Sequence, residues 1–373
     1  MSDRRVIIAC DKFKGSLDAR TVTSIIEDEV ARLTTHDIRS FLVADGGDGT
    51  LEALRAAGFA SHPTTATGPT GEAVDTSYLE RDGVAVVEMA DACGLLRLPG
   101  GKLAPTQASS EGLGQVIRAA LGKNPREVII GVGGSASTDG GVGMLAGLGA
   151  KFFAEDGSVL APSADNLAQI SSIDLDPVRS AIEGVTFTLA SDVDNPLLGE
   201  KGAVAIFGPQ KGLEGDNASR IETGLTHWAD LIAEETGDDL RDTPGAGAAG
   251  GVGFAAQAVL GARMRPGIAL VLELAGAREA LRDAALVITG EGSLDEQTLM
   301  GKTVAGVAAV AKQEGVKTVA VCGRNTLDDA QLASIDVSRA YALASIEADP
   351  KKSMANAEPL LRRRLADLVS DWL

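Results

Sequence analysis

The sequence predicts an α/β protein, in which buried strands alternate with amphipathic helices. Short runs of β-branched and other apolar residues recur along the chain, and each run ends on Gly or Asp. Buried parallel strands that lead into loops have this pattern. Segments with a helical spacing of apolar residues lie between the runs. Since open α/β sheets bind ligands beyond the carboxyl ends of their strands, the loops after the runs are candidate sites.

The predicted elements follow one another in a regular order. The predicted strands are, in chain order, RRVIIACD, IRSFLVADGG, VAVVEMAD, REVIIGVGG, VTFTLASD, AALVITGEG and VKTVAVCGR. A first helix is expected over 16–33, with Ser16 as its N-cap and an apolar face formed by Val22, Ile25, Ile26, Val30 and Leu33. A last helix is expected near the C-terminus, with an apolar face formed by Leu361, Leu365, Leu368 and Trp372.

Length and composition indicate a large globular protein. The chain has 373 residues, of which 45% are hydrophobic, and this is enough for two domains that each bury a core. The segment 62–72 is rich in Thr, Pro and Gly, so it is a candidate linker. A second boundary is expected near 276–285.

Charge and cysteine content exclude several classes of partner. The formal net charge of -18 argues against nucleic acids and anionic membranes, because both are bound through Lys and Arg. Cys10, Cys93 and Cys322 are far apart and form neither a disulfide framework nor a CxxC metal motif. The sequence shows no signal peptide and no apolar run of membrane-spanning length, so we expect a cytoplasmic protein.

The loops after the first two strands carry charged residues on glycine turns. In CDKFKGS, Asp11 is followed by Lys12, Lys14 and Ser16 at a helix start, where N–H groups and ammonium groups favour an anion. A capped helix with solvated lysines is the alternative. In ADGGDGT, Asp45 and Asp48 suit Mg²⁺ or a proton-accepting base, and Asx-turns are the alternative.

The loop GVGGSASTDGG has two interpretations. Gly131-x-Gly133-x-x-Ala136 matches a dinucleotide fingerprint, with Glu155 as an acid further on, and predicts an NAD-dependent dehydrogenase. The hydroxyls of Ser135, Ser137 and Thr138 instead favour phosphate contacts. A second match, GAGAAGGVG, has glycines at 245, 247 and 250 but does not follow a strand, so close packing is its alternative.

Later loops add more carboxylates and lysines. Asp192 and Asp194 follow a strand, and Lys211 lies on the Pro-Gly turn FGPQKG. The stretch TGEGSLDEQTLMGKT carries Glu291 and Asp295 and ends in Gly-Lys-Thr. Glu296 stands where a P-loop needs its leading glycine, so this stretch is not a complete P-loop.

The chemistry available at these strand ends is that of phosphoryl transfer. The three histidines, His36, His62 and His227, have no metal-ligand spacing, and there is no GxSxG motif for a serine hydrolase. Asp, Gly, Ser, Thr and a few Lys remain. Phosphoryl transfer needs these residue types, because the protein mainly positions Mg²⁺ and neutralises charge.

Six sequence blocks, in order, resemble the glycerate kinase family of the bacterial glycerate and glyoxylate pathways. The resemblance runs from about residue 5 to residue 325 through DKFKGSLDA, ADGGDGT, GVGGSASTDGGVGML, DVDNPLLGEKGAVAIFGPQKG, GAGAAGGVGF and TGEGSLDEQTLMGKTVAGVA. It implies phosphorylation of D-glycerate by ATP with Mg²⁺, commonly to 2-phosphoglycerate. It also implies a flavodoxin-like domain formed by both chain ends, 1–63 and 282–373, and an inserted α/β domain, 64–281, around a cleft.

With this resemblance, the candidate residues fall into four groups. For catalysis we expect Asp192 as base or substrate orienter, together with Asp45 and Lys14; for the metal, Asp45 and Asp48. Substrate contacts are expected from Asp11, Lys12, Ser16, Glu291 and Asp295. Nucleotide and phosphate contacts are expected from Gly133, Gly134, Ser135, Ser137, Asp139, Lys211 and Lys302.

Overall fold

The computed structural model describes residues 5–300 and 303–373. Contacts between Cα atoms divide the chain into two compact units. Unit 1 runs up to Asp45, takes in Glu52–Ala57 and continues over Ile268–Leu373, and unit 2 comprises Gly46–Leu51 and Gly58–Gly267. Both units combine parallel strands with helices, so the predicted α/β class is confirmed.

Unit 1 contains a parallel sheet with the strand order β14-β13-β12-β1-β2. This is the flavodoxin-like order, in which the second and third strands lie on opposite sides of the first. Such folds place ligands where the order reverses, here between β1 and β12. The strands span β1 Arg5–Cys10, β2 Ile38–Ser40, β12 Ala284–Leu294, β13 Thr318–Asn325 and β14 Val337–Ala342.

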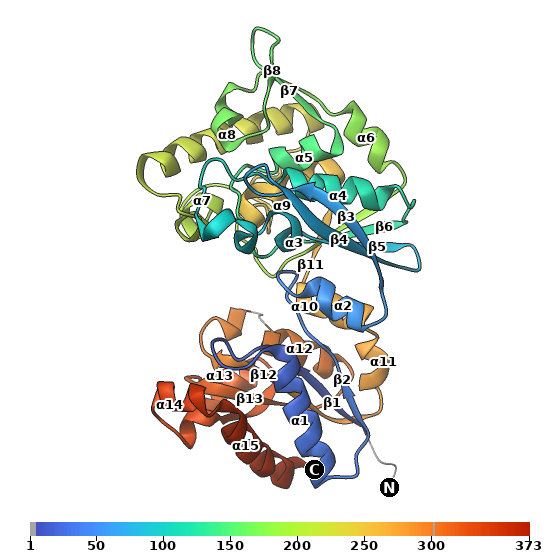
Figure 1. Ribbon diagram of the computed structural model, residues 1–373, viewed down its shortest axis with the longest axis vertical. Coiled ribbons are helices and arrows are strands. Elements are labelled where there is room, and N and C mark those ends of the chain that lie inside the picture. Colours follow the sequence, from blue (N-terminus) through green and yellow to red (C-terminus); the bar gives the residue numbers. More distant parts are fainter. Residues whose placement is uncertain (1–4, 301–302) are drawn as a thin grey trace. The chain divides into compact units, whose positions relative to one another are not determined.

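The first and last helices of the chain share one core in unit 1. Helices α1, Ala19–Leu33, and α15, Ala357–Trp372, lie side by side (Figure 1) and bury Ile26 and Leu365 against the sheet. The predicted face of α15 is therefore confirmed. The remaining helices that lie wholly or partly in unit 1 are α2 Thr50–Ala56, α10 Gly267–Leu274, α11 Ala277–Leu281, α12 Thr303–Gln313, α13 Asp329–Ser334 and α14 Pro350–Ala355.

The predicted start of α1 at Ser16 is wrong. The N-cap is Asp18, whose carboxylate accepts a hydrogen bond from the Thr21 N–H at 2.8 Å. Ser16 instead donates its hydroxyl to the Phe13 carbonyl oxygen at 3.0 Å. Phe13 and Leu17 form a short antiparallel bridge, and this bridge folds the segment into a tight turn before the helix begins.

Unit 2 contains a mixed sheet with the strand order β11-β10-β6-β5-β4-β3. Strands β5, β6, β10 and β11 run parallel, so their carboxyl ends meet at one edge of the sheet. A separate small sheet has the order β8-β7-β9. The strands span β3 Ala60–Thr67, β4 Ala73–Arg81, β5 Val84–Glu88, β6 Glu127–Gly131, β7 Lys151–Phe153, β8 Val159–Leu160, β9 Ser172–Asp174, β10 Thr186–Ala190 and β11 Arg263–Arg265.

The predicted linker at 62–72 is part of a β-hairpin. It forms most of β3 and the turn that leads into β4, and the two strands pair antiparallel with Thr67 opposite Ala73. Threonine is β-branched and favours extended backbone, so the Thr-rich composition marked a strand and not a loop. The expected domain boundary at 63/64 lies within β3, and that at 281/282 lies at the end of α11.

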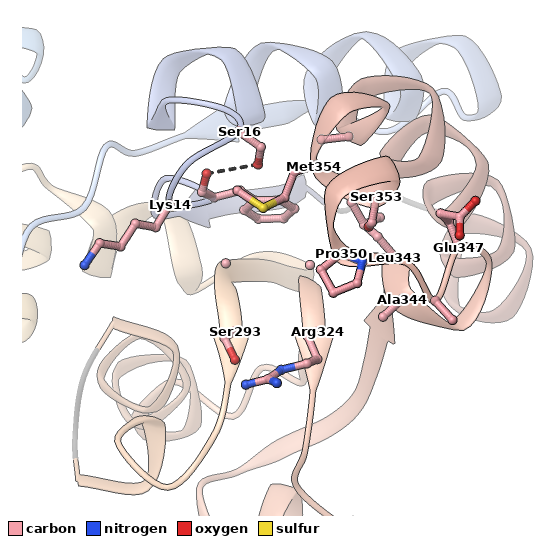
Figure 2. A pocket seen from close by; sticks show the side chains of 15 residues that line it. Lys14, Ser16, Ser293, Arg324, Leu343, Ala344, Glu347, Pro350, Ser353 and Met354 are labelled. Atoms are coloured by element: carbon pink, nitrogen blue, oxygen red, sulfur yellow. Dashed lines mark hydrogen bonds between the residues drawn. The ribbon is translucent and has the colours of Figure 1, made fainter.

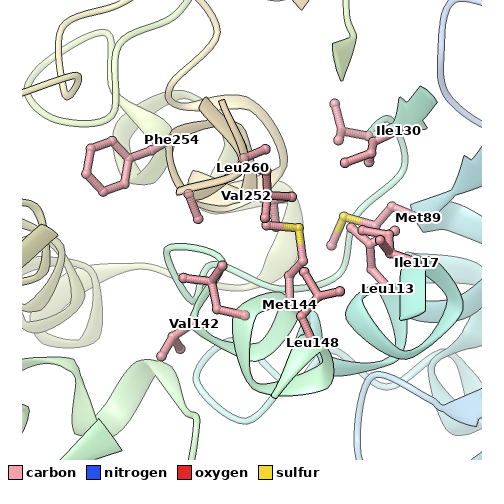
Figure 3. Close-up of a cluster of buried hydrophobic side chains, with 14 of the residues drawn as sticks. Met89, Leu113, Ile117, Ile130, Val142, Met144, Leu148, Val252, Phe254 and Leu260 are labelled. Carbon is pink, nitrogen blue, oxygen red and sulfur yellow. The ribbon is translucent and has the colours of Figure 1, made fainter. Parts of the chain in front are cut away.

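Helices of unit 2 pack around an apolar core. Figure 3 shows Met144 of α5 among Leu113 of α4 and Leu260 of α9, and all three side chains are buried. The helices span α3 Met89–Cys93, α4 Glu111–Leu121, α5 Val142–Leu148, α6 Asp176–Ile182, α7 Ala203–Phe207, α8 Gly215–Thr236 and α9 Val252–Leu260. No helix in the described part of the chain has the length and apolarity needed to cross a membrane.

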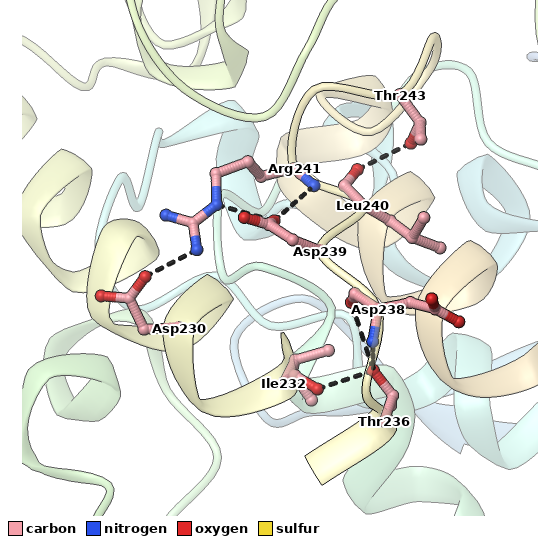
Figure 4. Close-up of polar contacts among 8 residues, drawn as sticks. All are labelled: Asp230, Ile232, Thr236, Asp238, Asp239, Leu240, Arg241 and Thr243. Carbon is pink, nitrogen blue, oxygen red and sulfur yellow. Dashed lines mark hydrogen bonds and ion pairs between the residues drawn. The ribbon is translucent and has the colours of Figure 1, made fainter. Parts of the chain in front are cut away.

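An arginine fixes the segment between α8 and the glycine-rich turn before α9. Arg241 pairs with Asp230 of α8 at 2.6 Å and with Asp239 at 2.7 Å (Figure 4). The carbonyl oxygen of Arg241 accepts a hydrogen bond from the Leu197 N–H at 2.8 Å. These contacts hold the chain where it enters the turn at 245–251, which packs against the loop after β6.

Candidate functional site

In unit 1, Asp11 lies at the switch point of the sheet. β1 and β12 pair in register up to Cys10 and Gly290, and the Asp11 N–H donates to the Gly290 carbonyl oxygen at 2.8 Å. Burial raises the pKa of the Asp11 carboxyl, and the charge of Asp45 adds to this effect, whereas a hydrogen bond from the Thr303 side chain opposes it. Asp11, Asp45 and Thr303 therefore form one polar group at the edge where a ligand is expected.

A threonine connects Glu291 near the end of β12 with the turn that follows this strand. Glu291 accepts a hydrogen bond from the Thr298 hydroxyl at 2.6 Å, and the Thr298 N–H donates to the Asp295 carbonyl oxygen at 2.9 Å. Glu291 therefore lies within β12 and not on a turn, and Thr298 connects it to the Asp295 backbone beyond the strand. Lys302, the other candidate of this stretch, lies outside the described residues.

A cavity of about 270 Å³ lies beside Lys14 in unit 1 (Figure 2). Its walls include apolar Leu343, Pro350 and Met354, and Lys14 and Arg324 line it as well. Ser293 of β12 and Arg324 of β13 are register partners on neighbouring strands. Sequence reasoning missed Arg324, although it follows the run VAVCG in the same way that other candidates follow their strands.

In unit 2, the turn that follows Asp45 lies close to the ends of β6 and β10. Gly46 has φ +86°, and a Cβ there would lie 2.3 Å from the Ala190 carbonyl oxygen, so only glycine fits. The Gly133 N–H donates to the Gly46 carbonyl oxygen at 3.2 Å. The glycines of ADGGDGT therefore allow a close approach of this turn to the strand ends.

A buried glutamate binds the backbone of this turn. Glu88 ends β5 with 5% exposure, and its carboxylate accepts hydrogen bonds from the Leu51 N–H at 2.8 Å and the Gly49 N–H at 3.3 Å. Burial raises the pKa of Glu88 to about 7, the two N–H groups oppose this rise, and the charge of Asp48 adds to it. Sequence reasoning missed Glu88, whose only signal was a charged residue at the end of an apolar run.

The loop after β6 does not have the geometry of a dinucleotide fingerprint. Residues 132–141 lie between β6 and α5, whereas the fingerprint requires a helix that starts directly at the glycine turn. Glu155, the proposed ribose ligand, is exposed on the turn between β7 and β8. The dehydrogenase interpretation is therefore not supported. A Cβ on Gly250 would lie 2.2 Å from the Ser137 carbonyl oxygen, so the second glycine motif serves close packing.

The predicted phosphate residues of unit 2 form a buried network. Lys211 is 2% exposed and donates hydrogen bonds to the Ser135 hydroxyl oxygen at 2.7 Å and the Ser137 carbonyl oxygen at 2.5 Å. Asp139 is fully buried, and one of its oxygens accepts from the N–H and hydroxyl of Ser110, both at 2.8 Å. Gly134, by contrast, is exposed. The structure thus brings these candidates together, mostly below the surface.

Asp192 lies at the carboxyl end of β10. Its Oδ1 atom accepts a hydrogen bond from the Gly267 N–H at 3.0 Å, which ties it to the segment after β11. The side chain is half-buried, whereas Asp194 two residues later is exposed. The structure thus fixes Asp192 and leaves Asp194 on the surface.

Comparison with known proteins identifies the family of this chain. A family model described as the glycerate kinase family matches residues 6–373. The chain belongs to the glycerate kinase family. It is therefore an enzyme, a kinase, and the resemblance found in the six sequence blocks is confirmed.

Relatives in this family match over most of their length. The glycerate kinase of Halalkalibacterium halodurans is 36% identical, and the match covers 98% of each chain. The glycerate 2-kinase of Escherichia coli is 40% identical over 87% of this chain and 86% of that protein. A crystal structure assigned to a glycerate kinase 2 of Salmonella typhimurium is 35% identical, with a TM-score of 0.83 and 99% coverage of both chains.

Proposed function

We propose that this member of the glycerate kinase family transfers the γ-phosphoryl group of ATP to D-glycerate and forms 2-phosphoglycerate. The observation that carries the proposal is the match to the family over residues 6–373, together with relatives at 36–40% identity that are named glycerate kinase or glycerate 2-kinase. The free, buried thiols of Cys10, Cys93 and Cys322 support a reducing compartment, so we place the enzyme in the cytoplasm.

For the acceptor we propose the residues around the switch point of unit 1. Lys12, Lys14 and Ser16 would attract and hold the carboxylate of glycerate, because a protein of net charge -18 needs local positive potential to capture an anion. Asp11, Glu291 and Asp295 would accept hydrogen bonds from the two hydroxyl groups of glycerate. The raised pKa of Asp11 is consistent with a half-buried, functional carboxyl.

For the nucleotide we propose the loop after β6. Gly133 and Gly134 would approach the phosphates with their backbone, and Ser135 would add its hydroxyl. Ser137, Asp139 and Lys211 support this loop from within the fold. We also retain Lys302 as a phosphate contact.

For Mg²⁺ we propose Asp45 and Asp48, with Asp192 as base or orienter of the acceptor hydroxyl. Both metal candidates are exposed carboxylates on one glycine turn, which is the oxygen donor set that Mg²⁺ accepts. No group of three or more His, Cys, Asp or Glu suited to a metal occurs in the described ranges, and Mg²⁺ commonly uses only one or two carboxylates with water and substrate phosphates. The ion would neutralise phosphate charge during transfer.

A coupled assay tests the function directly. Purified enzyme with ATP, Mg²⁺ and D-glycerate should release ADP, and the phosphorus NMR spectrum of the product should show the signal of 2-phosphoglycerate. A 3-phosphoglycerate signal would change the product and keep the reaction class. Absence of ADP release with D-glycerate, in a sample that is folded by circular dichroism, would refute the proposal.

A further inference from the structure

Several hydrogen-bond donors in the loop after β6 have no acceptor among the residues that the structure describes. The N–H groups of Gly134, Ser135, Ser137 and Thr138 donate no hydrogen bond to any residue that the structure describes. The hydroxyls of Ser137 and Thr138 are buried and have no partner within 5–300 and 303–373. Ser137 and Thr138 are 0% and 1% exposed, so a ligand cannot reach their donors from solvent. Ser135 is 5% exposed and follows the exposed Gly134, so its N–H, a nearly buried donor, can meet an acceptor that comes from outside the chain.

A buried ammonium group lies directly behind these donors. Lys211 donates to the Ser135 hydroxyl oxygen, so the hydroxyl hydrogen of Ser135 remains available for another acceptor. A hydroxyl that accepts a hydrogen bond from a cation becomes a stronger donor itself. Since Lys211 is only 2% exposed, it can act on a ligand through Ser135 but does not reach the surface.

Lys211 changes between its charged and neutral forms close to neutral pH. Burial lowers the pKa of Lys211 to about 7, and Asp139, the carboxylate that acts on it, opposes this shift. Asp139 is fully buried and accepts hydrogen bonds from Ser110, Gly141 and Gly143, so it is held in place by other partners. A negative ligand beside Ser135 would therefore favour the charged form of the lysine.

We propose that Gly134, Ser135 and Lys211 form a phosphate site in unit 2, in which the N–H groups of Gly134 and Ser135 and the Ser135 hydroxyl contact a phosphate oxygen. Lys211 is a positioning residue that holds Ser135 and the Ser137 carbonyl and becomes fully charged when the anion binds. Gly134 is exposed with φ +73°, so the ligand reaches the loop at this glycine. The inference rests on the proposed function, because the kinase reaction supplies a nucleotide phosphate.

Binding of ADP without Mg²⁺ between pH 7 and pH 9 tests the site by calorimetry. Wild-type affinity should fall as the pH rises, because the free enzyme loses the Lys211 proton that the phosphate stabilises. For one linked proton the limit is about tenfold per pH unit. A wild-type affinity that stays constant over this range would overturn the proposal.

Substitution of Lys211 shows whether this residue positions the phosphate site or only stabilises the fold. Lys211→Met should weaken ADP binding at pH 7 by roughly tenfold or more, the scale of a hydrogen bond to a charged group, and should remove the pH dependence. Lys201→Met, which removes an exposed lysine of the same unit, should behave as wild type. Thermal unfolding shows whether Lys211→Met is folded. If it is not folded, Ser135→Ala should show the loss of ADP affinity at pH 7 instead. The proposal would be overturned if a folded Lys211→Met variant, or Ser135→Ala, bound ADP with the wild-type affinity.

The binding assay also separates this inference from the proposed function. Wild-type protein that binds ADP with the expected pH dependence but does not phosphorylate glycerate would refute the function and support the phosphate site. Turnover of glycerate with pH-independent ADP affinity would refute the site alone. Adenosine lacks phosphates, so its affinity should be the same in wild type and Lys211→Met, and a tenfold loss there would overturn the phosphate assignment.

Discussion

At the scale of single residues, the structure separates carboxylates that look alike in the sequence. Asp192 and Asp194 stand two positions apart in SDVDNP, yet Asp192 is half-buried and bonded to the Gly267 N–H, whereas Asp194 is exposed. A group that orients a substrate must itself be held in place, so the fixed side chain is the better candidate. This difference makes the pair a matched test of the chemistry proposed for Asp192.

Asp192→Asn should lower kcat by on the order of 10²-fold or more while the affinity for ATP stays close to wild type, since this is the usual scale for loss of a general base. Steady-state kinetics measures kcat, and calorimetry with ATP in the absence of glycerate measures the affinity. Asp194→Asn is the control and should keep wild-type turnover. If the two variants had equal kcat values, Asp192 would have only a structural role in the turn.

At the scale of elements, Glu88 links β5 to the start of α2. Its two oxygens accept hydrogen bonds from the N–H of Gly49, which directly precedes that helix, and from the N–H of Leu51 in its first turn. A buried carboxyl in this place satisfies helix-start donors that otherwise have no partner. It also makes the turn sensitive to pH, because burial raises the pKa of Glu88 from 4.5 to about 7.

The raised pKa determines the sign of the pH dependence. Between pH 4.5 and about pH 7 the native state binds more protons at Glu88 than the unfolded state does, so this residue makes the protein less stable as the pH rises. Glu88→Gln cannot ionise, so the unfolding free energy of wild type minus that of Glu88→Gln should fall from pH 5 to pH 8. The limit is about 1.4 kcal/mol per unit of pKa shift.

Denaturant unfolding at both pH values measures this difference. Glu155→Gln, at an exposed position on the turn between β7 and β8, is the control and should give a difference that does not change with pH. A wild-type minus Glu88→Gln difference that is constant or rises with pH would contradict the buried, proton-binding state of Glu88.

At the scale of the whole molecule, each unit has apolar cores of its own. The large core cluster of unit 2 draws its members from residues 66–262, and the clusters of unit 1 draw theirs from 6–43 and 268–369. Unit 1 is therefore made from separated parts of the chain, whereas most of unit 2 is continuous in sequence. A continuous segment with its own core has the properties of an independently folding domain.

The fragment 46–267 should accordingly fold by itself. It contains the core of unit 2 and the turn Gly46–Leu51 that packs on the strand ends. We expect a cooperative thermal transition and the circular dichroism of an α/β protein. Fragment 268–373 lacks β1 and α1, which contribute Ile8, Val22 and Ile26 to its core, and should remain unfolded as a contrast. A non-cooperative transition for 46–267 would show that its core depends on the rest of the chain.

Local sequence patterns predicted much of this protein. The seven apolar runs all contain strands, and the C-terminal apolar face is buried. The Asp or Gly that ends a run lies at the carboxyl end of the strand in β1, β6 and β10, whereas β12 and β13 continue beyond their Gly residues. These features depend on the period of apolar residues and on turn chemistry, which short stretches of sequence encode. The six blocks added the family, which the comparison confirmed.

The tertiary structure alone decided which groups are buried and which are neighbours. The sequence predicted a linker at 62–72 from its composition alone. Its strand forms only by pairing with β4, and local composition does not show that pairing. Glu88 and Arg324 were missed because their neighbours, Leu51 and Ser293, come from distant parts of the chain. Lys211 resembled any turn lysine in the sequence. Its pKa near 7 arises from desolvation, which depends on every element packed around it.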